Sequence, residues 1–392
     1  MERTFLILAD GTRFEGTGKG FPIPSAHDLI EMAVEQAPCG EVVFNTSMGA
    51  YHEILTDASY AGQIVAMTCP HIGNYGSSPQ WNETLRTVPP CRALITRDFH
   101  DGPVPAGTQR LGDVLDAWGI SALSHVDTRA LTLHIREKGA MYGVLVRMDR
   151  EDGIAYEQVL QWLAGVPPME QRDFVGEVGC TEITSFTPEK PATMRFALVD
   201  YGEKQSILDQ LLARGIAVDL VPARTSARIL LEAQPPYDAV FLSNGPGDPA
   251  VLTEEVDIVR NLIGRIPVIG ICLGHQLIGQ ALGGRTGKMK FGHHGGNQPV
   301  RELETGKVLV TCQNHGYQVL ADSLPASTRV TYDNANDGTV EGLRDDEKGV
   351  ICVQFHPEAS PGPWDARRLF DDFIAFASTW RKKMASTAKE NA

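Results

Sequence analysis

The sequence predicts an α/β fold: a carboxy-terminal domain built on a mostly parallel sheet flanked by helices, preceded by a smaller α+β domain. The first observation is that continuous apolar strands alternate with amphipathic helices after about residue 193. That alternation is typical of a parallel sheet covered on both faces. The second is that strand-like and helical runs before residue 165 lack such regularity. The length of 392 residues also fits two domains.

The domain boundaries follow from a loss of the periodic pattern of apolar residues. Prolines and charges in VPPMEQRD and SFTPEKPATM interrupt any periodicity. We therefore expect an amino-terminal domain over residues 1–165, a linker region over 166–192 and a carboxy-terminal domain over 193–380. The charged stretch RKKMASTAKENA, residues 381–392, is expected to be a disordered tail.

The amino-terminal half offers fewer clear elements. Strands are expected over 41–45, 63–68 and 93–96. One helix should begin at Asp127 or Thr128, which are good capping residues, and stop at Gly139. The segment from Gly18 to Cys39 gives no interpretable pattern.

The carboxy-terminal half reads as strand and helix in turn. The sequence predicts strands over 196–200, 217–221, 239–243, 267–271 and 349–354, and helices over 204–213, 227–233, 254–263 and 275–282. Ligands of such sheets bind at the carboxyl ends of the strands. The candidate site residues are therefore expected there.

Composition narrows the functional classes. A formal net charge of −14 argues against a nucleic-acid binder, which needs basic patches. No apolar run approaches the roughly 20 residues that span a bilayer. The start, MERTFLILADGTRF, reads as a strand and turn instead of a signal peptide. We expect a cytoplasmic protein that binds neither nucleic acid nor membrane.

The seven cysteines are scattered, and none forms a C-x-x-C pair. This argues against a disulfide framework and a structural zinc site. His293 and His294 beside two glycines are expected to form a turn, with no metal bound.

Cys272 lies in Gly270-Ile271-Cys272-Leu273-Gly274, between a predicted strand and a predicted helix. A glycine two residues either side of a nucleophile is the nucleophile-elbow pattern. A free thiol is only a few per cent thiolate at neutral pH, and a helix amino terminus with a neighbouring histidine would raise that fraction. A buried structural cysteine is the alternative reading.

Two further motifs follow strand ends. His356-Pro357-Glu358 could supply a base and a carboxylate that orients it. Ser243-Asn244-Gly245-Pro246-Gly247 could expose backbone N–H groups as an oxyanion hole. When each motif is taken alone, a surface turn explains it equally well.

Together, SNGPGDP, GICLGHQ and HPE resemble the class I glutamine amidotransferase domain. The resemblance implies a catalytic triad of Cys272, His356 and Glu358. A further similarity, to the small subunit of carbamoyl phosphate synthetase, extends over nearly the whole chain. The blocks that carry it are KMKFGHHGGNQPV, QNHGYQV, HPEASPGP, EVVFNTSMGAYHEILTDASY and HIGNYG. MGAYHE departs from the family pattern M-T-G-Y-Q-E, which puts the local turn in doubt.

The resemblance also implies a set of glutamine-binding residues. These are Ser59, Gly245, Gly247, Leu273, Gln276, Asn314, Gly316 and Tyr317. Backbone N–H groups near Gly245 and Leu273 would stabilise the oxyanion.

The resemblance implies a glutaminase that works in a heteromer with the large synthetase subunit, in arginine or pyrimidine biosynthesis. No Walker motif G-x-x-x-x-G-K-[S/T] occurs in the chain, so ATP and magnesium are expected on the large subunit, with no cofactor on this one. Three alternatives remain open: a glutaminase subunit for another acceptor synthase, a non-catalytic regulatory subunit on the same fold, and a cysteine hydrolase of another amide. The sequence does not indicate allosteric effectors or the oligomeric state.

Overall fold

The structure is a computed structural model that describes residues 2–85, 89–360 and 362–390. Its contacts divide the chain into two units. One comprises residues 1–172 with 290–295, and the other residues 173–289 with 296–392. Residues 391 and 392 of the expected tail and Pro361 of the HPEASPGP block lie outside the described residues.

The amino-terminal unit is built around a closed barrel. Among the described residues its strands follow the order β1-β2-β8-β6-β4-β3-β9. The barrel strands are β1 (Glu2–Leu8), β2 (Arg13–Gly20), β3 (Cys39–Asn45), β4 (Gln63–Met67), β6 (Ala93–Ile95), β8 (Ser121–Ser124) and β9 (Met141–Asp149). A small separate sheet pairs β5 (His71–Ile72) with β7 (Asp98–Phe99). The predicted strands in this half are confirmed, but the sequence did not indicate that they close into a barrel.

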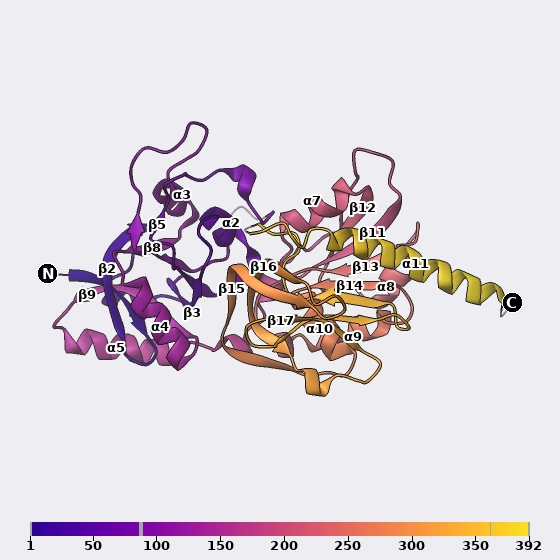
Figure 1. The fold of residues 1–392 in the computed structure, drawn as a ribbon. Coiled ribbons are helices and arrows are strands. Elements are labelled where there is room, and N and C mark those ends of the chain that lie inside the picture. The colour runs from indigo at the N-terminus through magenta and orange to yellow at the C-terminus, as the bar shows by residue number, and fades with distance from the viewer. Residues whose placement is uncertain (1, 86–88, 361, 391–392) are drawn as a thin grey trace. The chain divides into compact units, whose positions relative to one another are not determined.

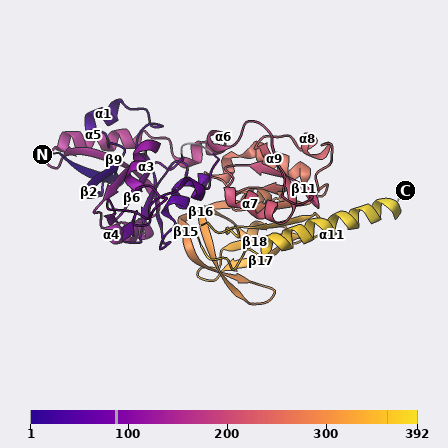
Figure 2. The ribbon, with the colours of Figure 1, turned by 90° about the horizontal axis from the view of Figure 1, so that it is seen from above.

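Helices cover this barrel. They are α1 (Ala26–Glu31), α2 (Tyr51–Thr56), α3 (Leu111–Trp118), α4 (Thr128–Lys138) and α5 (Gly153–Ala164), with short 3-10 turns η1 (Ala58–Tyr60), η2 (Pro79–Trp81) and η3 (Met169–Gln171). Helix α4 has the predicted ends, because the Asp127 side chain accepts a hydrogen bond from Ala130 N and the helix stops at Gly139. Helices α1 and α5 lie side by side and share an apolar cluster with β9 (Figure 2).

The segment MGAYHE, which departs from the family pattern, gives helix α2 an unusual start. Ala50 precedes α2 in the left-handed conformation, with φ 60° and ψ 35°. Glycine adopts that conformation without the steric penalty that a Cβ brings. Alanine is therefore strained at this position.

The carboxy-terminal unit contains one large sheet (Figure 1). In the described part of the chain its order is β10-β12-β11-β13-β14-β19-β18-β17-β15-β16. The strands are β10 (Thr184–Phe186), β11 (Met194–Asp200), β12 (Ile216–Pro222), β13 (Ala239–Leu242), β14 (Val268–Ile271), β15 (Thr286–Glu302), β16 (Val308–Val319), β17 (Arg329–Asn334), β18 (Val340–Asp345) and β19 (Val350–Val353). Five neighbouring strands of this sheet run parallel to one another, as the alternation of strands and helices predicts. They are β12, β11, β13, β14 and β19.

Helices pack on both faces of this sheet. They are α6 (Phe174–Val178), α7 (Gln205–Ala213), α8 (Ala227–Leu231), α9 (Thr253–Leu262), α10 (Leu273–Ala281) and α11 (Leu369–Glu390), with 3-10 turns η4 (Pro249–Val251) and η5 (Ala321–Ser323). Apolar residues of α8, α9 and α10 share one core cluster, and those of α7 and α11 share the other. On β11, Ala197 and Val199 join the first cluster while Phe196 and Leu198 join the second. This alternation explains why the strand is apolar throughout.

Several boundaries differ from the sequence interpretation. The region expected as a linker contains α6 and β10, and β10 pairs with β12. The stretch expected as a disordered tail is helical in α11 as far as Glu390. The turn expected at His293 and His294 is wrong, because both residues belong to β15. Backbone hydrogen bonds from Ala140 N to Lys290 O and from Thr46 N to His294 O hold this stretch extended.

Candidate active site

Cys272 occupies the sharp turn between β14 and α10. Its backbone has φ 53° and ψ −102°, a conformation that L-residues rarely adopt. A Cβ on Gly274 would overlap the carbonyl oxygen of Leu242, and one on Gly270 would lie 2.7 Å from Ile278 Cδ1. The glycines on either side of the cysteine therefore allow strand and helix to approach, as the elbow pattern predicts.

His356 and Glu358 lie just beyond β19, the strand next to β14 in the sheet. His356 N donates to Cys312 O at 2.8 Å, which ties this segment to β16. His356 Nδ1 lies 2.6 Å from Glu358 Oε1, and both side chains are buried. The three predicted triad residues thus follow adjacent parallel strands at the same edge of the sheet.

The electrostatic environment favours an ion pair between His356 and Glu358. Burial lowers the pKa of His356, but the charges of Glu358 and Cys272 outweigh it and raise the pKa to about 10. Burial raises the pKa of Glu358, but Lys204 and His356 together lower it to about 2. An imidazolium beside a carboxylate is therefore the stable state of this pair at neutral pH.

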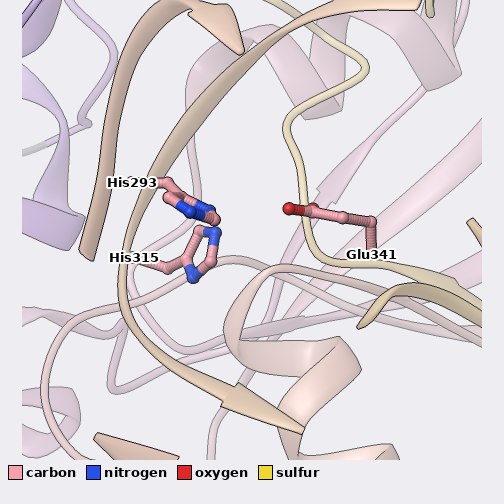
Figure 3. Close-up of side chains that lie close together, drawn as sticks. All are labelled: His293, His315 and Glu341. Carbon is pink, nitrogen blue, oxygen red and sulfur yellow. The ribbon is translucent and has the colours of Figure 1, made fainter. Parts of the chain in front are cut away.

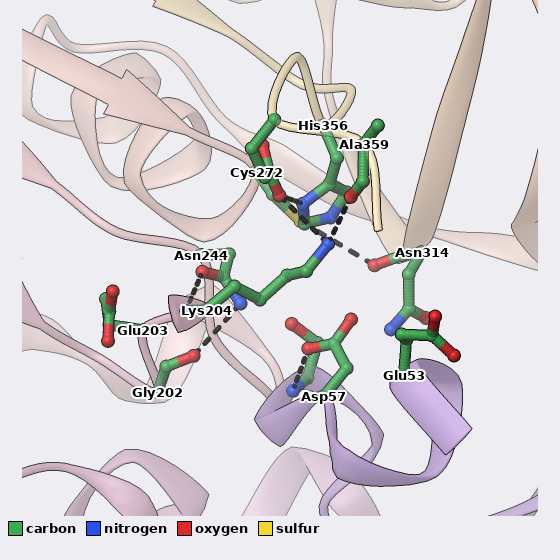
Figure 4. A network of polar contacts seen from close by, with 12 residues as sticks. Glu53, Asp57, Gly202, Glu203, Lys204, Asn244, Cys272, Asn314, His356 and Ala359 are labelled. Carbon is green, nitrogen blue, oxygen red and sulfur yellow. Dashed lines mark hydrogen bonds and ion pairs between the residues drawn. The ribbon is translucent and has the colours of Figure 1, made fainter. Parts of the chain in front are cut away.

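Lys204 is a site residue that the sequence analysis missed. Its side chain is almost completely buried, and Nζ lies 3.1 Å from Glu358 Oε1. The same Nζ donates to Ala359 O at 2.6 Å (Figure 4). Its backbone N donates to Asn244 Oδ1, while Asn244 Nδ2 donates to Gly202 O. The only hint in the sequence was a lysine at a helix amino terminus, where a cation is unfavourable.

The loop Asn244–Gly247 adjoins the elbow. A Cβ on Gly245 would lie 2.7 Å from Leu273 Cδ2 and would overlap Tyr201 O, so only glycine fits. Gly247 has φ 89°, and Asp248 caps the following turn by accepting from Ala250 N. Gly245 and Leu273, the two predicted oxyanion positions, are therefore close neighbours.

The predicted glutamine-binding segment on β16 also reaches the elbow. Cys272 Sγ lies 3.6 Å from Asn314 O. Gln276 Nε2, on α10, donates to Tyr317 O at 3.0 Å. Gly316 lies between these contacts, and a Cβ there would meet no atom within 4 Å. The fold thus gathers Gln276, Asn314 and Tyr317 beside the nucleophile.

His315 lies in the same segment. Its Nδ1 is 2.8 Å from Tyr317 O and its Nε2 is 3.0 Å from Gln313 Oε1. Glu341 on β18 is fully buried, and its nearest carboxylate oxygen is within 4.8 Å of a ring nitrogen of His315 (Figure 3). The two hydrogen bonds of the His315 ring are made to residues of its own strand, β16. The expectation that no metal binds stays a prediction.

Ser59 belongs to the amino-terminal unit. It lies in η1, where its backbone N donates to Asp57 Oδ1 at 2.8 Å. Its implied contact with the substrate stays a prediction. No helix among the described residues is long and apolar enough to cross a membrane.

Comparisons with known proteins agree with this architecture. Residues 197–376 match the model of the glutamine amidotransferase class-I family, and residues 6–145 match that of the carbamoyl-phosphate synthase small chain, CPSase domain. The carboxy-terminal unit is therefore a class I glutamine amidotransferase domain, which makes the chain a glutamine-hydrolysing enzyme component.

Curated relatives cover nearly the whole length of the chain. The carbamoyl phosphate synthase small chain of Methanopyrus kandleri is 43% identical, over 95% of this chain and 98% of its own. That of Escherichia coli strain K12 is 40% identical, over 97% of this chain and 99% of its own. Among solved structures, a glutamine amidotransferase from Thermotoga maritima is 20% identical with a TM-score of 0.36, covering 49% of this chain and 85% of that one. The chain belongs to the carbamoyl phosphate synthase small chain family.

Proposed function

We propose that this chain hydrolyses L-glutamine through a thioester on Cys272 and passes the ammonia to the large subunit of a carbamoyl phosphate synthase. The observation that carries the proposal is the convergence of Cys272, His356 and Glu358 at one edge of the sheet, with the His356–Glu358 hydrogen bond at 2.6 Å. The family relationship supports the acceptor, because its small-chain members are named for carbamoyl phosphate synthesis.

The first half of the reaction forms the thioester. The Cys272 thiolate attacks the side-chain amide carbon of glutamine, and backbone N–H groups near Gly245 and Leu273 stabilise the oxyanion. One such donor contributes about 10²–10³ in rate. The protonated His356 gives its proton to the leaving nitrogen, and ammonia departs as the C–N bond breaks. Glu358 keeps the imidazole oriented and stabilises its positive charge.

The second half hydrolyses the thioester. His356, now neutral, takes a proton from water as the water oxygen attacks the acyl carbon. The C–S bond then breaks, glutamate leaves, and Cys272 returns to a thiolate beside a protonated His356. Gly247, Gln276, Asn314, Gly316 and Tyr317 would hold the substrate.

Ammonia must reach its acceptor without entering water. In water ammonia is mostly protonated, and ammonium is not a nucleophile. We therefore assign the acceptor site, with its ATP and magnesium, to the large subunit, and we expect an enclosed passage for ammonia between them. For the same reason the isolated chain should hydrolyse glutamine slowly, and docking of the large subunit should accelerate it.

The test is glutamate release from glutamine by the purified chain, with and without a cognate large subunit. Wild type and Cys272→Ser are compared at equal concentration. Release that requires Cys272 and increases with the large subunit is the expected result. Equal release by Cys272→Ser would overturn the catalytic role. Cys272-dependent release that does not respond to the large subunit would overturn the partner.

A further inference from the structure

Gln354 is a buried amide that the proposed mechanism leaves unused. It directly follows β19 and precedes His356 by two residues. Its side chain is fully buried, and its Oε1 lies 3.1 Å from Gln276 Nε2. Gln276 stands four residues after Cys272, in the first turns of α10. Gln354 thus connects the segment that carries the triad histidine with a predicted substrate contact.

One main-chain carbonyl determines how both amides are oriented. Tyr317 O lies 3.0 Å from the Gln276 amide and can only accept a hydrogen bond, so the atom facing it must be Nε2. The second hydrogen of that same Nε2 points to Gln354, which must therefore present its oxygen. The usual ambiguity between amide oxygen and nitrogen does not arise here, because the chain of bonds begins at an obligate acceptor.

This orientation sets the chemistry that Gln276 offers. Both Nε2 hydrogens are used, by Tyr317 and Gln354, so Oε1 is the remaining polar atom. That oxygen has no hydrogen-bond partner among the residues that the structure describes. A hydrogen-bond donor of glutamine, from its ammonium or its amide group, would satisfy it. A carboxylate would be repelled.

We propose that Gln354 is a positioning residue for glutamine recognition: it locks the Gln276 amide so that an acceptor faces the substrate. The inference rests on the proposed function. Without the Gln354 oxygen, the bond to Tyr317 O would be the one hydrogen bond from the described residues that still restrains the Gln276 amide. The amide could then turn and leave a buried N–H unsatisfied, which weakens binding by about tenfold to a hundredfold.

The structure also supplies a matched control. Gln354 Nε2 makes no hydrogen bond with any described residue, so the network uses only the oxygen of this side chain. Gln354→Glu keeps an oxygen at that position and nearly the same volume, and burial would keep its carboxyl group neutral. Gln354→Met keeps the length and removes the acceptor.

The experiment measures KM and kcat for glutamine in the full complex with a cognate large subunit. Alkylation of Cys272 by iodoacetamide, which does not need the glutamine contacts, reports whether the elbow is intact. For Gln354→Met we expect KM to rise at least about tenfold, kcat to stay within about threefold, and alkylation to be unchanged. Gln354→Glu should restore KM to within about threefold of wild type.

Other outcomes would overturn the inference. An unchanged KM in Gln354→Met would show that Gln276 needs no support, and an equal rise in Gln354→Glu would show that shape, not the acceptor, matters. If Gln354→Met does not fold, Gln354→Asn withdraws the oxygen by one methylene and should raise KM in the same way. A wild-type complex without Cys272-dependent glutamate release would instead overturn the proposed function as a whole.

Discussion

Lys204 Nζ lies 3.1 Å from Glu358 Oε1, and both side chains are almost completely buried. The same carboxylate oxygen receives the hydrogen bond from His356 Nδ1 at 2.6 Å. Glu358 is therefore shared between two cations. A buried carboxylate needs such compensation, because removing a charge from water is expensive.

Lys204→Met should destabilise the carboxy-terminal unit. The substitution keeps most of the apolar volume but leaves Glu358 with one cation instead of two. Breaking a buried ion pair from one side typically costs about 3 kcal/mol or more in the free energy of unfolding. Urea unfolding measures the loss, and Arg228→Met is the control. The Arg228–Glu232 pair is exposed, so its loss should change stability by less than about 0.5 kcal/mol. Equal effects of the two variants would contradict the shared-carboxylate arrangement.

The His356–Glu358 pair predicts a definite pH dependence. The pKa of His356 is raised from 6.5 to about 10, so its contribution to stability is complete below about pH 6.5 and disappears as the pH rises through 10. The pKa of Glu358 is lowered from 4.5 to about 2, so its contribution is complete above about pH 4.5 and disappears as the pH falls through 2. Glu358→Gln should therefore lose more unfolding free energy at pH 6 than at pH 10. Equal losses at the two pH values would show that His356 is not charged beside Glu358.

The imidazole can also be followed directly. In wild type, NMR titration of His356 should show a pKa far above the usual 6.5, because Glu358 and Cys272 outweigh the effect of burial. Glu358→Gln removes the first of these charges while the ring stays buried. The measured pKa should then fall by more than one unit. An unchanged value would mean that Glu358 does not determine the charge of His356.

Gly274→Ala should distort the elbow. The added methyl group would overlap the carbonyl oxygen of Leu242, which is main chain and cannot rotate away. We expect a loss of about 2 kcal/mol in unfolding free energy, together with a large loss of glutaminase activity. Gly316→Ala is the stability control, since a Cβ there meets no atom within 4 Å. Equal melting temperatures for the two variants would contradict the close approach of β13, which ends at Leu242, and α10.

Ala50→Gly should stabilise the amino-terminal unit slightly. Ala50 is held at φ 60°, where a Cβ is strained by about 1–2 kcal/mol. Glycine removes that strain but loses more backbone entropy on folding, so the net gain should be about 0.5–1 kcal/mol. Thermal unfolding of the full chain measures it. A destabilised Ala50→Gly variant would show that the alanine methyl group contributes packing that outweighs the strain.

The predicted part of the site came from motifs that are local in sequence. One motif is Cys272 with its flanking glycines, and the other is His356 with Glu358. Each follows a strand that the sequence predicts from its apolar run. The rule that parallel strands bring their carboxyl ends to one edge then predicts that the motifs meet. Lys204 and Gln354 carried no comparable signal. Each acts through a side chain distant in sequence, Glu358 for the lysine and Gln276 for the glutamine.

The sequence by itself determined the fold class of the carboxy-terminal unit and the positions of its five parallel strands and of helices α7, α8, α9 and α10. Through the resemblance of its motifs to a known family, it also determined the three triad candidates. These depend on apolar periodicity, helix capping and glycine at sharp turns, all of which act over a few residues. Only the tertiary structure decided that the amino-terminal strands close into a barrel, since β1 pairs with β9 across the register Leu6↔Leu145. It also decided which way the Gln276 amide faces. That orientation depends on Tyr317, which lies on β16, and on Gln354, which directly follows β19. Hydrogen bonds between segments so far apart are selected by packing of the whole unit, and no local pattern encodes them.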